Sequence, residues 1–114
     1  MVTYSVQVML FFLVFPSFIG FSPDQVVVEG DPVTIALTCL ADGNPAPNIT
    51  WTRVFDNDSD SDVLFTGNPY VINSNRNNAG RYRCKADNGI GSAINQTIRV
   101  TVNCKYSAFP IISG

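Results

Sequence analysis

Residues 33–39 read VTIALTC, the clearest strand pattern in the chain. Positions 33, 35, 37 and 39 are apolar and share one face, while Thr34, Ala36 and Thr38 share the other. Alternation with period two predicts a strand with one buried face. Similar short runs, at residues 25–29, 49–52, 82–86 and 94–102, are separated by turn residues, and no stretch of ten residues shows a helical period. The sequence therefore predicts an all-β fold, an antiparallel sandwich or barrel.

Two cysteines help to choose between a sandwich and a barrel. Cys39 ends the strand quoted above on its buried face, and Cys84 lies on the buried face of the strand at residues 82–86. A buried thiol in each of two facing sheets is placed to cross-link them, and closing a loop of this length stabilises a domain by about 4 kcal/mol. Such a disulfide persists in an oxidising compartment. The alternative is a cytosolic domain with two reduced core cysteines.

The spacing of further residues resembles a known family. Cys39, Trp51 and residues 78–84 (NAGRYRC) resemble an immunoglobulin domain of the I-set or C2 type. Residues 43–51 (GNPAPNITW) resemble the B–C loop of that family, and residues 86–91 (ADNGIG) resemble its F–G hairpin. The resemblance covers about residues 23–103.

This resemblance implies an immunoglobulin-like antiparallel β-sandwich of about seven strands with a short C′–D region. It implies that Trp51 packs against a Cys39–Cys84 disulfide and that Tyr82 forms the tyrosine corner. Two residues depart from the family pattern. Asn78 replaces the usual Asp, so a buried arginine–aspartate bridge is not expected, and Ser74 replaces an apolar residue, which predicts a weak middle of the sandwich.

Outside this domain we expect two further segments. Residues 1–22 contain an uncharged apolar run and small residues, as in a cleaved signal peptide. The alternatives are an uncleaved anchor, an incomplete N-terminus, or a buried strand of the domain. Residues 104–114 are expected to be a linker or a truncated tail. In it, Cys104 is free, pairs between chains, pairs with a downstream domain, or has no designed role.

The composition excludes several functions. The chain has 114 residues, a net charge of −2 and no histidine, so histidine-based catalytic triads and histidine metal sites are absent. No basic cluster is present to bind nucleic acid. The acidic residues 56–62 alternate like the start of an EF-hand but lack its glycine and glutamate, so we expect a solvated loop. No enzyme activity, metal or cofactor is predicted.

Three asparagines lie in N-glycosylation sequons: Asn48, Asn57 and Asn95. The period-two pattern directs Asn48 and Asn95 outward and places Asn57 in a loop. In a secreted chain, all three would be accessible to modification.

We therefore expect an extracellular recognition module, secreted or at the cell surface, which is the first immunoglobulin-like domain of an adhesion or receptor protein. Its protein partner would be homophilic or heterophilic, and a membrane would be reached only through an anchor absent from this sequence. Contact is expected through the B–C loop or the F–G turn, or equally through a sheet face. The candidate contact residues are Asn44, Pro45, Asp87, Asn88, Gly89 and Ile90. The alternatives are a spacer in a tandem array and an intracellular muscle-type domain.

Overall fold

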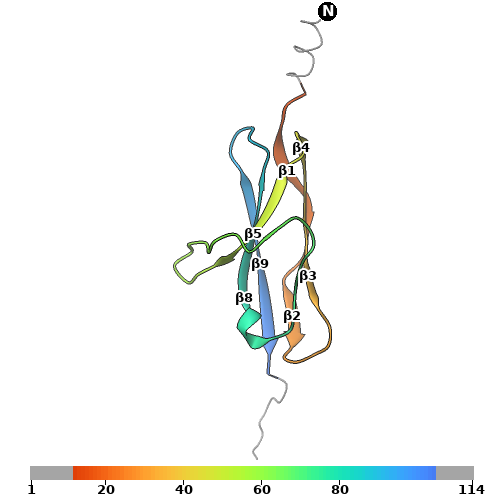
Figure 1. Ribbon diagram of the computed structural model, residues 1–114, viewed down its shortest axis with the longest axis vertical. Helices are drawn as coiled ribbons and strands as arrows, with labels where there is room; N and C mark the ends of the chain where they lie inside the picture. The colour runs from red at the N-terminus through yellow and green to blue at the C-terminus, as the bar shows by residue number, and fades with distance from the viewer. Residues whose placement is uncertain (1–11, 105–114) are drawn as a thin grey trace, which may run out of the picture.

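A computed structural model of the protein describes residues 12–104, which form nine strands and one 3-10 helix (Figure 1). The larger sheet has the strand order β2–β9–β8–β5–β6. Its strands are β2 (Gln25–Val28), β5 (Asn48–Val54), β6 (Phe65–Thr66), β8 (Gly80–Asp87) and β9 (Ile94–Asn103). All its neighbours are antiparallel except β2 and β9, which are parallel.

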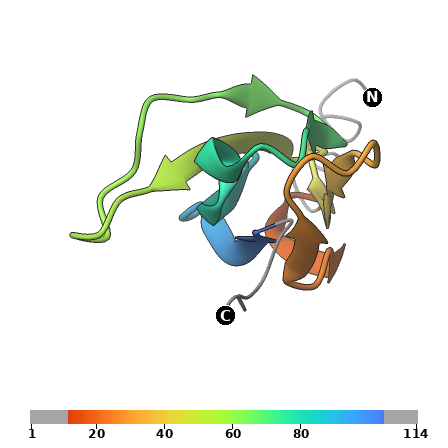
Figure 2. The ribbon, with the colours of Figure 1, turned by 90° about the horizontal axis from the view of Figure 1, so that it is seen from below.

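The second layer consists of two strand pairs. β1 (Val14–Phe21) pairs with β4 (Cys39–Asn44), and β3 (Ile35–Leu37) pairs with β7 (Tyr70–Ile72). Only Thr38 separates β3 from β4, so the two strands continue one another and join both pairs into one layer. The helix η1 (Arg76–Asn78) leads into β8. Figures 1 and 2 show the two layers facing each other along the long axis of the sandwich.

The core fills the space between these layers. It contains residues from six strands of both sheets, namely Ile35, Leu37, Cys39, Ile49, Trp51, Ile72, Tyr82, Cys84, Ala86, Ile98 and Val100. Because side chains alternate across a strand, the residues between these core positions point outward. The predicted immunoglobulin-like sandwich is confirmed.

The disulfide and the two predicted aromatic residues lie at the centre of this core. Cys39 and Cys84 are joined across the two layers. Trp51 lies opposite Cys84 in the sheet, is fully buried, and donates its indole N–H to the Gly67 carbonyl at 3.0 Å. The Tyr82 hydroxyl donates to the Asn78 carbonyl at 2.7 Å, which is the geometry of a tyrosine corner.

The two departures from the family pattern have distinct outcomes. Ser74 is 3 % exposed, and its hydroxyl donates to the Asp31 carbonyl at 2.8 Å, so the buried polar group is satisfied. Near Asn78, the guanidinium of Arg53 bonds the carbonyls of Asn77 and Ala79 and lies over the Tyr82 ring. Arg53 thus bonds backbone oxygens at this end of the sandwich.

Strand β1 lies in the segment for which a leader was predicted. Residues 14–21 pair with β4, Pro16 is buried, and Phe18 packs on the core. The structure therefore extends the folded unit before residue 23, as in the stated alternative of a strand of the domain. Cleavage after residue 22 stays a prediction. It would remove β1, so the bonds that β1 makes exist only in a chain that retains these residues. Residues 1–11 and 105–114 lie outside the described residues, within which no helix is long and apolar enough to span a membrane.

Candidate functional site

The two predicted contact loops lie side by side at one end of the sandwich (Figure 1). We call this region the loop end: the B–C loop (residues 44–48) and the F–G turn (residues 87–92). Residues of both loops line an open hollow of about 520 Å³, which continues onto the outer face of the larger sheet. Its lining comprises Pro45, Ala46, Asn48, Thr50, Val63, Lys85, Asp87, Asn88 and Gly89.

The side chain of Asn88 joins three segments at this end. Its Nδ2 donates to the Val14 carbonyl at 2.7 Å and to the Pro45 carbonyl at 3.0 Å. Its Oδ1 accepts from the Ile90 N–H at 3.0 Å. Both donor hydrogens are therefore engaged, and one amide ties the F–G turn to β1 and to the B–C loop.

A second asparagine adds another bond between β1 and the B–C loop. Asn44 donates from Nδ2 to the Phe12 carbonyl at 2.6 Å. The carbonyl of Phe12, two residues before β1, bonds the B–C loop, and the carbonyl of Val14, the first residue of β1, bonds the F–G turn. The loop end is thus a three-part unit in which β1 is the third component.

Two glycines shape the F–G turn. Gly89 has a φ of 78°, and its N–H donates to the Asp87 carboxylate at 2.9 Å. Gly91 has a φ of 69°, and a Cβ there would lie 2.8 Å from the Phe15 ring. Gly91 is therefore required both by its left-handed backbone and by the close approach of β1.

The structure brings together most of the predicted contact residues. Pro45, Asp87, Asn88 and Gly89 line the hollow, whereas Asn44 faces β1 and Ile90 is half-buried in the turn. The sequence analysis missed the part that β1 plays, because its apolar run indicated a leader. No local signal identifies its carbonyls as partners of asparagines far along the chain.

The three sequons all belong to the larger sheet or its connections. Asn48 lies in β5, Asn95 in β9, and Asn57 in the connection from β5 to β6. All three are exposed. The Oδ1 of Asn57 accepts from the N–H and the hydroxyl of Ser59, at 3.1 and 2.6 Å.

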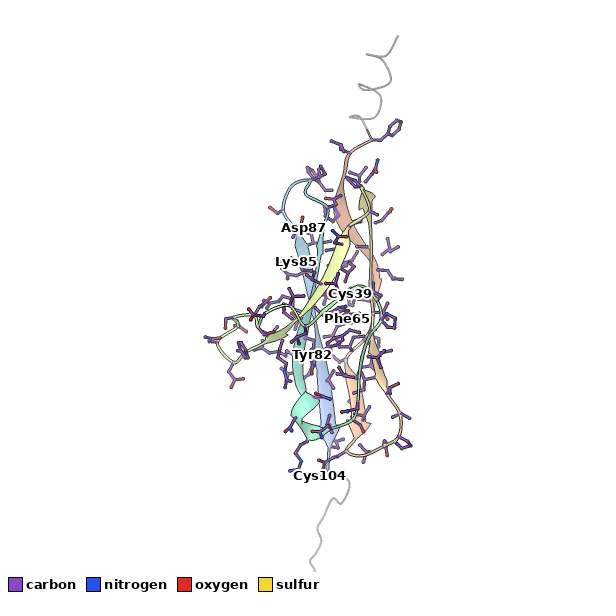
Figure 3. All side chains as sticks on the ribbon, viewed as in Figure 1. Cys39, Phe65, Tyr82, Lys85, Asp87 and Cys104 are labelled. Carbon is purple, nitrogen blue, oxygen red and sulfur yellow. A yellow bond between two sulfur atoms is a disulfide. The ribbon has the colours of Figure 1, made fainter. Side chains whose placement is uncertain are left out.

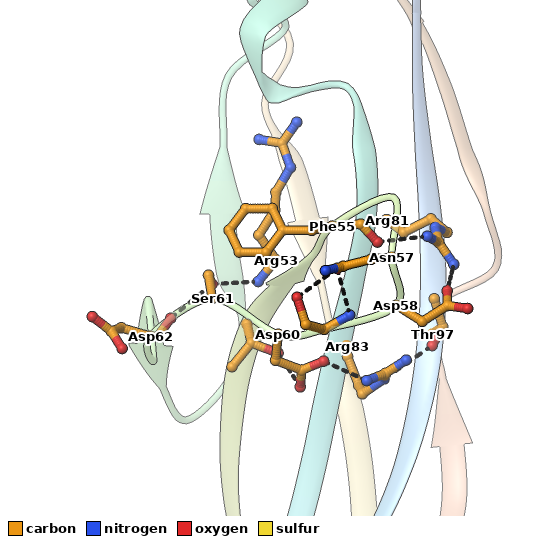
Figure 4. A network of polar contacts seen from close by, with 12 residues as sticks. Arg53, Phe55, Asn57, Asp58, Asp60, Ser61, Asp62, Arg81, Arg83 and Thr97 are labelled. Atoms are coloured by element: carbon orange, nitrogen blue, oxygen red, sulfur yellow. Dashed lines mark hydrogen bonds and ion pairs between the residues drawn. The ribbon is translucent and has the colours of Figure 1, made fainter.

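The acidic connection is fastened to the sheet by arginines (Figure 4). Arg81 pairs with Asp58 at 2.8 Å, and Arg83 pairs with Asp60, which also accepts from the Thr52 hydroxyl. These carboxylates therefore neutralise arginines. Over residues 12–104, no group of three histidine, cysteine or acidic residues could hold a metal ion.

Perturbed acid–base groups lie away from the loop end. Burial raises the pKa of the Tyr82 phenol above its ordinary value of 10.0. A hydrogen bond from the exposed Arg76 lowers the pKa of the Glu29 carboxyl. Both groups have structural partners, since Tyr82 bonds the Asn78 carbonyl and Glu29 pairs with Arg76.

Comparison with known proteins now gives the family. The family model of the immunoglobulin domain matches residues 16–88. The chain is an immunoglobulin domain. The match begins inside β1.

Its relatives include proteins that are named for a membrane anchor or a membrane. This immunoglobulin domain is 42 % identical over 77 residues to MAM domain-containing glycosylphosphatidylinositol anchor protein 2 of Mus musculus, covering 65 % of the chain and 8 % of the relative. It is 37 % identical over 100 residues to the limbic system-associated membrane protein of Gallus gallus, covering 85 % and 28 %. The chain thus spans less than a third of the length of each relative.

Solved structures agree with this assignment. In the Dpr2 Ig1-Ig2 complex with DIP-Theta Ig1-Ig3, one chain matches with a TM-score of 0.65 and 31 % identity, covering 79 % of this chain and 32 % of that one. In Dpr11 IG1 bound to DIP-gamma, the values are 0.67 and 28 %, with coverage of 80 % and 49 %. Both neighbours are immunoglobulin domains in complexes between proteins.

Proposed function

We propose that this immunoglobulin domain is an extracellular, non-catalytic recognition module, the first such domain of a cell-adhesion or receptor protein. Its partner is a protein, either a second copy or a different chain. It is secreted or lies at the cell surface. The contact surface is the loop end.

One observation carries this proposal: the Asn88 amide fixes the F–G turn, the B–C loop and β1 to one another. A surface that is already ordered loses less conformational entropy on binding, so more of its contact energy appears as affinity. The disulfide between the layers adds rigidity beneath it. The neighbours in protein complexes and the adhesion relatives support the same function.

The test compares two arginine substitutions in the oxidised chain, made in a bacterial periplasm without glycans. Ala46→Arg places a bulky cation on the exposed B–C loop. Val71→Arg is the matched control, because Val71 is 50 % exposed on the opposite layer. Clumping of beads coated with the chain reports homophilic binding, and tetramers of the chain report heterophilic binding to cultured cells.

We expect at least one assay to be positive, with Ala46→Arg abolishing binding and Val71→Arg preserving it. Binding in neither assay would contradict the recognition function. Binding that is lost only in Val71→Arg would move the contact surface to the opposite layer.

The arrangement of the chain favours a spacer as the second candidate. Figure 3 places Cys104 at the end of the sandwich opposite the beginning of β1, so the domain can lie in series between neighbours. The full-length sequence distinguishes the two functions. Many near-identical domains would favour a spacer, and a single membrane anchor would favour a receptor.

A further inference from the structure

Lys85 lies between two sequons on the outer face of the larger sheet. Asn95 is its direct partner on β9, and Thr50 is its direct partner on β5. Asn48 lies opposite Asp87, two residues from Lys85 along β8. Because Tyr82, Cys84 and Ala86 point into the core, Lys85 and Asp87 point outward (Figure 3).

Short distances separate these side chains. Directly opposite residues in an antiparallel pair have Cβ atoms about 5 Å apart, and diagonal neighbours about 7 Å apart. Asn48 and Asn95 therefore flank Lys85 within the reach of a single sugar residue. Asn48 and Lys85 also line the same hollow of the loop end.

Neither the third sequon nor the second layer has this arrangement of two sequons around a lysine. Asn57 belongs to the connection that Arg81 and Arg83 fasten beside the sheet, and no sequon falls within β1, β3, β4 or β7. The sequons of the described strands thus lie on one side of the sandwich. Glycans are bulky and strongly solvated, so two of them at neighbouring positions exclude large molecules from the surface beneath.

We propose that N-linked glycans on Asn48 and Asn95 together close the outer sheet face around Lys85, including the hollow. Transfer joins the asparagine Nδ2 to the anomeric carbon of an oligosaccharide, breaks the bond from that carbon to a lipid diphosphate donor, and releases an amide proton. This inference rests on the proposed recognition function. By closing this face, glycosylation controls the access of a partner to the loop end. A partner of the glycosylated chain must approach over the loop tips from the side of β1, where Phe15 is 67 % exposed.

The test measures acylation of Lys85 by a water-soluble biotin ester in the chain secreted from a eukaryotic host. Thr50→Ala and Thr97→Ala each remove one sequon and retain the asparagine. Thr50→Ser and Thr97→Ser are the matched controls, because serine preserves each sequon. Asn57→Gln removes the third sequon, which belongs to the connection paired with Arg81 and Arg83. Peptide mass spectrometry reports glycan occupancy and acylation at each site.

We expect both glycans to be present and Lys85 to react severalfold more slowly in the unsubstituted chain than in the double alanine variant. The serine variants and Asn57→Gln should keep this protection. Equal reactivity with and without both glycans, or absence of glycans at both sites, would overturn the proposal. This readout requires no partner, so it stands or fails separately from the binding assays above.

Discussion

Substituting Asn68 by alanine should destabilise the domain, because the side chain completes a strand ladder. β3 and β7 pair Leu37 with Tyr70, and the same antiparallel register places Asn68 opposite Cys39. At this position the side chain of Asn68, in place of its backbone, forms the hydrogen bonds to the backbone of Cys39. Its Oδ1 accepts from the Cys39 N–H at 2.9 Å, and its Nδ2 donates to the Cys39 carbonyl at 2.7 Å.

The expected loss follows from these two bonds. Each contributes about 0.5–1.5 kcal/mol net, and a buried group left without a partner costs about 1–3 kcal/mol. Cys39 is fully buried, but Asn68 is exposed, so water reaches part of the vacated space. We therefore expect Asn68→Ala to lower the free energy of unfolding by about 2–4 kcal/mol. Asn68→Asp should cost a similar amount, because its carboxylate faces the Cys39 carbonyl.

Urea unfolding of the oxidised protein, followed by the fluorescence of the single tryptophan, measures this loss. Asn103→Ala is the control, since Asn103 is exposed at the last position of β9 and should cost at most about 0.5 kcal/mol. Coinciding midpoints for Asn68→Ala and Asn103→Ala would refute the reasoning. So would full stability of Asn68→Asp at neutral pH.

Three other perturbations test the scaffold. Replacing Cys39 and Cys84 together by alanine opens a loop with a sequence separation of 45 residues, and urea unfolding should show a loss of about 4 kcal/mol; an unchanged midpoint would contradict a stabilising disulfide. Tyr82→Phe removes the bond to Asn78 and should cost about 1 kcal/mol at neutral pH. Because burial raises the pKa of Tyr82, its contribution is fully present below pH 10.0 and is lost as the pH rises through the folded value. The difference in unfolding free energy between the unsubstituted protein and Tyr82→Phe should therefore be smaller at alkaline pH than at neutral pH. A difference that does not change with pH would argue against this link between the ionisation of Tyr82 and stability. Deleting residues 1–22 should lower stability by about 2 kcal/mol relative to deleting residues 1–11, because Phe18 and the other buried atoms of β1 are lost; equal midpoints would show that β1 is dispensable.

The sequence predicted the sandwich well where burial alone determines the structure. The alternation through Ile35, Leu37 and Cys39 correctly identified buried positions. Val33 belongs to the same pattern but is 54 % exposed, because β3 begins only at Ile35. Periodicity reports which residues share a face, whereas the onset of a strand depends on where a partner strand is available.

The loop end was predictable only in part. Turn chemistry placed Pro45, Asn88 and Gly89 in loops, and the family resemblance placed those loops at one end. The part that β1 plays was not predictable, because an uncharged apolar run suits both a leader and a strand. What distinguishes them is pairing with β4, a contact between residues far apart in the sequence.

Asn44, Asn68 and Asn88 use the same physical device. Each bonds a backbone carbonyl at a place where regular strand pairing ends. A neutral amide carries both donors and an acceptor, so it can replace a backbone group without the desolvation that a buried charge requires. The ion pairs of Arg81 and Arg83 hold only the acidic connection between β5 and β6, where salt screens them. The loop end is therefore held by hydrogen bonds of neutral amides, which depend little on ionic strength.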